Sequence, residues 1–202
     1  MENMKVLLYL EGEKYLSKSG IGRAIKHQER ALKLAGIDYT TDPEDDYDLV
    51  HINTYGLKSW QLMKKAQKAG KKVIMHGHST EEDFRNSFIG SNQAAPLFKE
   101  YLCRFYQQAD ALITPTDYSK QLIQTYGVDT PIFVVSNGID LSRYVPDKTK
   151  EETFRRYFSL SQKDPVVICA GLYFKRKGIE DFVKVAEKMP HVRFIWFGET
   201  NR

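Results

Sequence analysis

The stretch MKVLLYL at residues 4–10 is followed by SGIGR at residues 19–23, which opens a helical pattern over residues 21–35. An apolar run without polar alternation predicts a strand that is buried on both faces, as in parallel sheets. Short apolar runs and helical patterns alternate through most of the chain, which predicts an α/β fold with a doubly wound, Rossmann-like parallel sheet. The other expected strands are residues 37–41, 48–52, 72–75, 111–114, 132–135, 166–170 and 192–197, and the other expected helices are residues 57–69, 94–108, 116–126, 151–158 and 179–189.

The clearest shift in composition is the polar, proline-ended stretch SLSQKDP at residues 159–165. We therefore expect an N-terminal domain over residues 1–158, a linker over 159–165 and a first βαβ unit over 166–202. A unit of that size buries too little surface to fold alone. At about 150 residues per domain, the chain corresponds to roughly 1.3 domains, so the second Rossmann-like domain is expected to be incomplete.

Composition excludes several classes of protein. Hydrophobic residues make up 42% and charged residues 28% of the 202 residues, which is ordinary for a globular protein and unlike a disordered one. No apolar run reaches the roughly 20 residues of a membrane span, and the N-terminus lacks a basic leader, so a cytoplasmic location is expected. The net charge of +4 gives no indication of nucleic-acid binding. Cys103 and Cys169 are interpreted as reduced thiols.

Helix ends carry local signals. Thr149 and Glu152 have the spacing of a capping box, which predicts a helix start at that point. Gly36, Gly70 and Gly127 each follow a helical run and are expected to end it.

Two glycines, Gly20 and Gly22, follow the first strand at the point where the first helix opens. Glycines there allow backbone N–H groups to approach a phosphate at the positive end of the helix. The third glycine of the dinucleotide fingerprint is missing, so a tight strand-to-helix turn without a ligand is the alternative.

His76 and His78 follow the strand at residues 72–75, at the end where such folds place their sites. Three interpretations are open: a transition-metal site completed by the acidic residues 81–83, a polar contact or proton handler for a bound hydroxyl, or two loop histidines without a role. Asn137 and Gly138 follow the strand at residues 132–135 and are expected to form a tight turn that can reach a cleft.

Charge is unevenly distributed. The segment 57–73 holds six lysines and no acid, and apolar residues recur within it at every third position, at 57, 60, 63, 66 and 69. We expect a crossover helix that buries this stripe; the alternative is a helix that rests on anionic lipid. The acidic run at residues 42–48 lacks the glycine and distal glutamate of a calcium loop and is interpreted as a connector. A second basic cluster, at residues 175–177, precedes a helix and suits a diphosphate, or is a solvated loop.

Taken in order, six segments of the chain resemble the retaining, nucleotide-sugar-dependent glycosyltransferases of group 1, which have the GT-B fold of two facing Rossmann-like domains. These segments are residues 19–22, 48–51, 73–78, 109–116, 135–140 and 177–180. Residues 76–88, 175–178 and 194–198 are most similar to bacterial diacylglycerol glucosyltransferases, which are peripheral membrane enzymes that use UDP-glucose.

The resemblance implies roles for individual residues. Gly20 and Gly22 would approach the donor phosphates, and His78 would contact the transferred sugar beside His76. Lys177 matches the phosphate-binding lysine, and Arg176 replaces an arginine that the family has where this chain has Leu172. Asn137 and Gly138 would lie at the cleft, and the acceptor or membrane would meet residues of the basic helix: Lys58, Trp60, Lys64, Lys65 and Lys68.

The resemblance also predicts partners and an activity. The expected partners are a nucleotide sugar, a lipid or glycan acceptor and an anionic membrane surface, with no cofactor and no essential metal. The family's E-x7-E pair does not occur before Arg202, so this chain alone is expected to lack the full donor site and to be inactive. Two other classes stay open: a non-catalytic anion- or lipid-binding module, and a metal hydrolase that uses His76 and His78.

Overall fold

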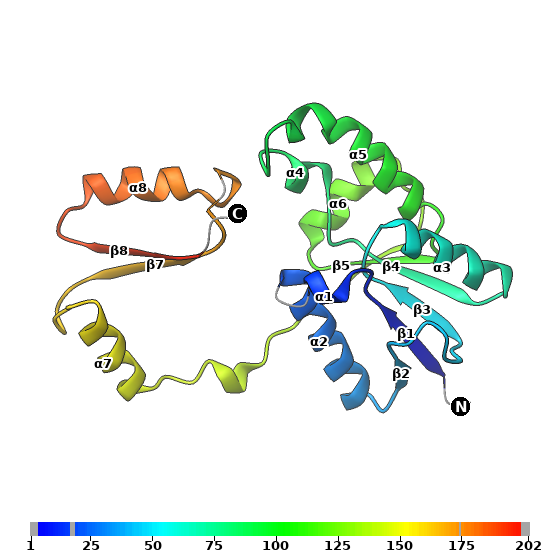
Figure 1. The fold of residues 1–202 in the computed structure, drawn as a ribbon, viewed down its shortest axis with the longest axis horizontal. Coiled ribbons are helices and arrows are strands. Elements are labelled where there is room, and N and C mark those ends of the chain that lie inside the picture. Colours follow the sequence, from blue (N-terminus) through cyan, green and yellow to red (C-terminus); the bar gives the residue numbers. More distant parts are fainter. Residues whose placement is uncertain (1–3, 17–18, 174, 199–202) are drawn as a thin grey trace. The chain divides into compact units, whose positions relative to one another are not determined.

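The structure, a computed structural model, describes residues 4–16, 19–173 and 175–198 (Figure 1). The chain divides into two compact units. One consists of Met1–Glu82 and Ala94–Ile139, and the other of Asp83–Gln93 and Asp140–Arg202. The domain boundaries drawn from the sequence stay a prediction.

Within the described part of the first unit, six strands form one fully parallel sheet in the order β2-β1-β3-β4-β5-β6. This confirms the predicted doubly wound α/β fold. The direction of winding reverses between β1 and β3, which is where such sheets open a crevice at the carboxyl ends of their strands. The strands are β1 (Lys5–Tyr9), β2 (Asp38–Thr40), β3 (Leu49–Ile52), β4 (Lys72–His76), β5 (Ala111–Thr114) and β6 (Ile132–Val134).

The helices lie close to their predicted positions, with additions at the carboxyl end of the sheet. The short α1 (Glu13–Leu16) and α4 (Glu81–Phe84) were not predicted because four residues carry no periodicity. Gly36, Gly70 and Gly127 have φ of 67°, 72° and 77°, which confirms them as helix stops. The longer helices are α2 (Gly20–Leu34), α3 (Leu57–Lys68), α5 (Ser91–Tyr106) and α6 (Asp117–Thr125).

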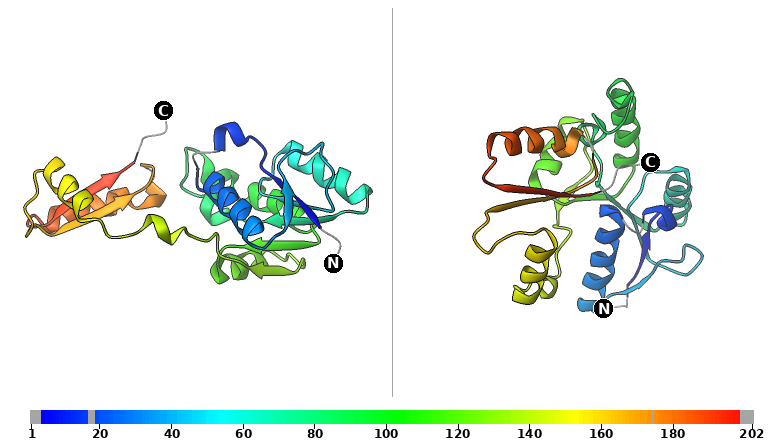
Figure 2. Two further views of the ribbon diagram at one scale, coloured as in Figure 1. Left: turned by 90° about the horizontal axis from the view of Figure 1, so that it is seen from below. Right: turned by 60° about the vertical axis from the view of Figure 1, so that its left-hand side comes forward.

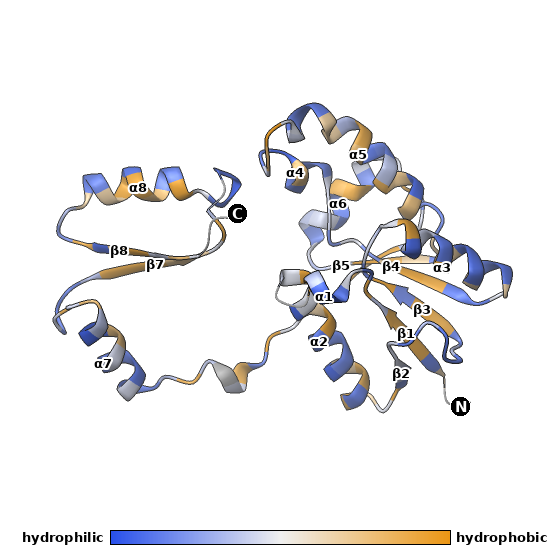
Figure 3. Cartoon of the chain, viewed as in Figure 1, coloured by the Kyte–Doolittle hydropathy of each residue, from blue (hydrophilic) through white to orange (hydrophobic). Residues whose placement is uncertain are grey.

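The two faces of this sheet are covered by different helices. One face holds the main apolar core, in which Leu7, Val50 and Met75 pack with residues of α3, α5 and α6. Alternate strand residues point the other way, so Val6 and Leu8 are buried on the opposite face, where α2 lies. Figure 3 shows apolar residues concentrated on strands such as β5, while the helices are striped.

The buried face of α3 corrects the sequence prediction. Met63 and Ala66 are fully buried as expected, but the face is completed by Ser59 and Leu62, while Leu57 is 69% exposed. Steps of three residues rotate by 300° around a helix, so a stripe at every third position drifts off one face within a few steps.

The second unit contains a parallel pair of strands, β7 (Val166–Ala170) and β8 (Arg193–Phe197), with α8 (Ile179–Lys188) on one side and α7 (Lys148–Tyr157) on the other (Figure 2). The short 3-10 helices η1 (Leu141–Arg143) and η2 (Lys175–Lys177) precede α7 and α8. The predicted capping box at Thr149 is wrong. Asp147 is the N-cap of α7, because its carboxylate lies one turn before Lys150 and accepts from that amide at 3.2 Å.

Among the described residues, no helix is long and apolar enough to cross a membrane. Cys103 and Cys169 are both free thiols, as predicted.

Candidate functional site

Two histidines come from neighbouring strands and point to the same face of the sheet. On β3, His51 lies between Val50 and Ile52, which belong to the apolar core on the other face. On β4, His76 follows Met75 in the same alternation. The period of two in a strand therefore directs both imidazoles toward α2.

His78 joins them through a turn at Gly77. The His78 amide donates to the His76 carbonyl at 2.9 Å, and a Cβ at Gly77 would lie 3.0 Å from Ile123 Cδ1, so glycine lets the chain pass close to α6. The rings of His76 and His78 stack with centroids 3.9 Å apart, and those of His51 and His76 with centroids 5.3 Å apart. Beyond His78, the buried Tyr106 hydroxyl donates to the Ser79 carbonyl at 2.7 Å and holds this loop.

Two side-chain amides connect the three rings. Gln28 of α2 and Asn53, just after β3, bond to each other twice, at 2.8 and 3.1 Å. Gln28 Nε2 also lies 3.2 Å from His76 Nδ1, and Asn53 Oδ1 lies 3.0 Å from His78 Nε2. His51 Nε2 completes the network 3.1 Å from His76 Nδ1.

Burial keeps this histidine cluster, His51, His76 and His78, uncharged. It lowers the pKa of His51 to about 3, with a smaller effect from His76. Burial also lowers the pKa of His76 to about 4, against an opposing interaction with Asn137, and that of His78 to about 3. The cluster therefore offers neutral hydrogen-bonding groups near pH 7.

Two polar atoms of this region are buried without a well-aligned hydrogen bond: His76 Nε2 and Asn137 Oδ1. Asn137 lies in the turn after β6, where Gly138 has φ of 73° and its amide bonds to Ser136 Oγ at 3.2 Å. The structure thus brings together three predicted site residues, His76, His78 and Asn137.

The glycine loop begins α2 as predicted. Ser19 is the N-cap, and its hydroxyl accepts from the Gly22 amide at 3.2 Å. A Cβ at Gly20 would meet nothing within 4 Å, whereas Gly22 is buried. Gly20 therefore leaves open space at the helix N-terminus, which is the property that the phosphate interpretation needs.

Glu11 is a positioning residue that the sequence did not reveal. Its carboxylate accepts from the Ser59 amide and from the Ser59 hydroxyl, each at 2.8 Å, and so caps α3 from the loop after β1. A Cβ at Gly56 would collide with the Glu11 carboxylate in its capping position, so this cap needs glycine there. Gln28, Asn53 and His51 were also missed; the only signal was a histidine inside an otherwise apolar strand.

The basic cluster of the second unit lies just before α8, whose N-cap is Gly178 with φ of 78°. Lys177 packs its stem against Gly171, where a Cβ would lie 3.7 Å from Lys177 Cγ. Within this unit, Arg176 Nε donates to Ser87 Oγ at 3.2 Å, and its Nη1 lies 3.5 Å from Asp83.

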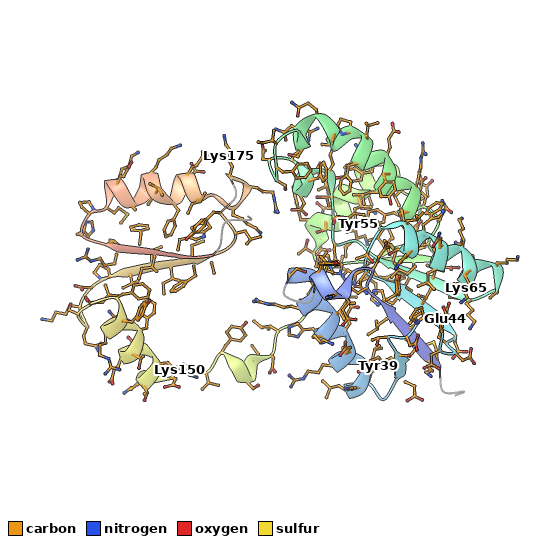
Figure 4. The ribbon with its side chains drawn as sticks, in the orientation of Figure 1. Tyr39, Glu44, Tyr55, Lys65, Lys150 and Lys175 are labelled. Atoms are coloured by element: carbon orange, nitrogen blue, oxygen red, sulfur yellow. The ribbon has the colours of Figure 1, made fainter. Side chains whose placement is uncertain are left out.

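The lysines of α3 are exposed, but several have partners. Lys65 and Glu44, both labelled in Figure 4, are 3.4 Å apart, and Lys71, just after the helix, lies 3.2 Å from Asp46. The acidic connector therefore partly neutralises the basic segment. Trp60 packs edge-on against Phe105 beneath the Lys64 ammonium group, and is therefore mainly part of the core. Lys58 and Lys68 make no ion pair in the part of the chain that the structure describes.

In the described ranges, no group of three or more His, Cys, Asp or Glu side chains is arranged to hold a metal ion. The two histidines of the metal-site interpretation, His76 and His78, stack face to face and bond to neighbouring amides and to His51.

Comparison with known proteins links this site to a family. Residues 18–143 match the domain described as Glycosyltransferase Family 4. The chain is 50% identical over 200 residues to the processive diacylglycerol alpha-glucosyltransferase of Acholeplasma laidlawii, covering 98% of this chain and 59% of that protein. It is 24% identical over 210 residues to the alpha-galactosylglucosyldiacylglycerol synthase of Streptococcus pneumoniae, covering 98% and 54%. The chain therefore spans a little more than half the length of these relatives.

Among solved structures, Anabaena HepE in complex with UDP and glucose matches with a TM-score of 0.64 and 16% identity, over 98% of this chain and 62% of that one. This likeness confirms the predicted GT-B type of fold.

Proposed function

Because the chain belongs to glycosyltransferase family 4, we propose that it is the acceptor-side part of a retaining hexosyltransferase that moves glucose from UDP-glucose to a lipid, diacylglycerol, or to a glycan. The observation that carries this proposal is the high identity to the Acholeplasma enzyme over nearly the whole chain. The UDP and glucose in the HepE structure support the donor. A non-catalytic lipid-binding module is not favoured, since both relatives are named as enzymes.

In this proposal, His78 contacts the transferred sugar, and the stacked ring of His76 lies beside it. Neutral imidazoles suit this role, because an uncharged ring can donate one hydrogen bond to a hydroxyl or accept one from it. Asn137 and Gly138 border the same cleft. Gly20 and Gly22 approach the diphosphate at the start of α2, where a Cβ at Gly20 would meet nothing within 4 Å.

Transfer with retention then follows on one face of the sugar. The bond from the anomeric carbon to the diphosphate oxygen breaks, the acceptor oxygen bonds to that carbon from the same side, and the acceptor proton passes to the departing diphosphate. Lys177, Arg176 and helix N-termini stabilise the negative charge that develops on the leaving group.

We further propose that the reaction needs no resident metal, because these cations would perform the task that a metal performs elsewhere. Transfer by the complete gene product that carries this chain should be unchanged after dialysis against EDTA. Loss of activity that returns only with added Mg²⁺ or Mn²⁺ would overturn this part of the proposal.

An anionic membrane surface is the proposed location of the lipid acceptor, met by the exposed side of α3. Lys58, Lys64 and Lys68 are exposed, and Leu57 at the start of the helix is 69% exposed. Lipid headgroups would attract these cations at low salt. The triple variant Lys58→Ala, Lys64→Ala, Lys68→Ala should lose flotation with anionic vesicles, whereas the charge-matched variant Lys148→Ala, Lys163→Ala, Lys188→Ala should keep it. If both variants float equally well, the proposal that α3 binds the anionic membrane surface is contradicted.

The activity itself is tested with the complete gene product, radiolabelled UDP-glucose and vesicles that contain diacylglycerol. We expect a glucolipid whose anomeric configuration, read from its proton coupling, is that of the donor. Transfer only to a soluble glycan would replace the lipid acceptor, and an inverted product would contradict the proposed mechanism.

A further inference from the structure

The hydrogen bonds around the histidine cluster determine where its protons lie. A backbone carbonyl only accepts, and the His51 carbonyl lies 3.4 Å from one terminal atom of the Asn53 side chain. That atom is therefore the amide nitrogen, and Asn53 Oδ1 points the other way. If both amides of the Gln28–Asn53 pair were flipped together, Asn53 Oδ1 would face the His51 carbonyl oxygen at 3.4 Å and this hydrogen bond would be lost.

This orientation propagates to each ring. Asn53 Oδ1 accepts from Gln28 Nε2 and also from His78 Nε2, so His78 carries its proton on Nε2. The second proton of Gln28 Nε2 points to His76 Nδ1, which must accept. His76 then carries its proton on Nε2, the buried atom without a well-aligned bond. His51 Nε2–H shares the one lone pair of His76 Nδ1 with the Gln28 amide, because an unprotonated His51 Nε2 would face that lone pair at 3.1 Å.

We propose that Gln28 and Asn53 are positioning residues that fix all three histidines as Nε2–H tautomers, so that His78 presents an accepting Nδ1 while the buried His76 Nε2–H faces Asn137. An accepting ring nitrogen is what a sugar hydroxyl can donate to, so the tautomer of His78 decides which hydrogen bond it offers to the sugar. Their role in sugar transfer rests on the proposed function, but the tautomers themselves can be measured without any activity.

The surroundings of the cluster contain no competing charge among the described residues. The pKa values of the three imidazoles are lowered by burial and, for His51 and His78, by neighbouring imidazoles, while the groups that contact them from α2, from the end of β3 and from the turn after β6 are the neutral amides of Gln28, Asn53 and Asn137. A carboxylate at position 28 would be the first negative group beside His76 Nδ1. An opposite charge at that distance raises the pKa of an imidazole by about 1–3.

The test uses the chain as it stands, with long-range ¹H–¹⁵N spectra of its imidazole rings. In the wild type, His51, His76 and His78 should each show the Nε2–H pattern between about pH 5 and 8, with no titration. In Gln28→Glu, His76 should titrate at a higher pH than in the wild type. In Gln28→Met, which has a similar shape and no donor, the His76 and His78 nitrogens should shift toward mixed tautomers.

Gln61→Met, at an exposed position of α3, is the matched control and should leave all three rings unchanged. If Gln28→Met unfolds the chain, Asn53→Asp provides the second test, since its carboxylate should raise the pKa of His78. An Nδ1–H tautomer in any of the three wild-type rings would overturn the proposal, as would a His76 signal that is the same in the wild type and in a folded Gln28→Glu variant. Normal tautomers in a chain whose complete gene product transfers no sugar would instead contradict only the proposed function.

Discussion

The two faces of the six-stranded sheet differ in where their polar groups lie. On the α2 face, buried imidazoles and amides satisfy one another through short, specific bonds, as in the Gln28–Asn53 pair. On the α3 face, apolar strand residues such as Leu7 and Val50 form the core, and the cations lie outside, where Lys65 meets Glu44 in solvent. A buried polar group must have a partner, whereas an exposed charge gains little from one. The α2 face is therefore where residue identity is tightly constrained.

The largest effect on stability is expected in the apolar core of the α3 face. Met63→Ala removes a fully buried side chain and should lower the free energy of unfolding by about 2–5 kcal/mol. Leu57→Ala, at an exposed position of the same helix, should change it by less than about 0.5 kcal/mol. Urea unfolding of both variants checks the assignment of the buried face, and equal losses would contradict it.

Lowering the pH should destabilise the protein through the histidine cluster on the α2 face. Unfolded histidines protonate below about pH 6.5, while the folded pKa values of about 4 and about 3 keep the cluster neutral. The unfolded state thus binds more protons between these values, so the free energy of unfolding falls as the pH decreases from about 6.5 and the loss is complete near pH 3. The expected loss between pH 6.5 and 5 is about 1.6 kcal/mol for each imidazole.

This pH dependence is measured by urea unfolding at several pH values for the wild type and for His51→Asn, which keeps a polar group but cannot titrate. The variant should show a weaker dependence on pH. If the free energy of unfolding depends on pH in the same way in both proteins, the histidine cluster is not the source of that dependence.

A smaller effect is expected where the loop after β1 meets α3. Glu11→Ala leaves two backbone amides at the start of α3 without their acceptor and should cost about 1–2 kcal/mol. Glu13→Ala, which changes the same charge at an exposed position nearby, is the control and should be near neutral. A neutral Glu11→Ala would show that water replaces the cap.

The smallest effect is expected for the exposed charges. Lys65→Ala breaks a solvent-exposed ion pair with Glu44 and should change the free energy of unfolding by less than about 1 kcal/mol, an effect that salt reduces further. A larger, salt-insensitive loss would mean that this face also depends on specific polar contacts.

Local patterns were sufficient to predict much of the fold. The runs at residues 111–114 and 166–170 coincide with β5 and β7, and Gly36, Gly70 and Gly127 end their helices as expected. The capping-box prediction failed at α7 because two residues could cap this helix. Asp147 is the cap and not Thr149, because its carboxylate accepts from the amide of Lys150, one turn further on.

The candidate site was only half predictable. His76 and His78 follow a predicted strand and are only two residues apart, so the sequence alone predicts that they lie close together. Gln28 and Asn53 could not, because each contacts partners 25 to 48 residues away and neither belongs to a local motif. Their importance arises from the strand order, which places β3 beside β4 under α2.

The most direct test of the account is the rate at which the complete gene product transfers glucose from UDP-glucose to diacylglycerol when His78 is replaced. His78→Ala should reduce the rate by about 100-fold or more, the usual effect of removing a positioned group at a reaction centre, while His191→Ala in the second unit should leave it unchanged. A His78→Ala enzyme that transfers glucose at the wild-type rate would contradict the assignment of the histidine cluster as the site of sugar transfer.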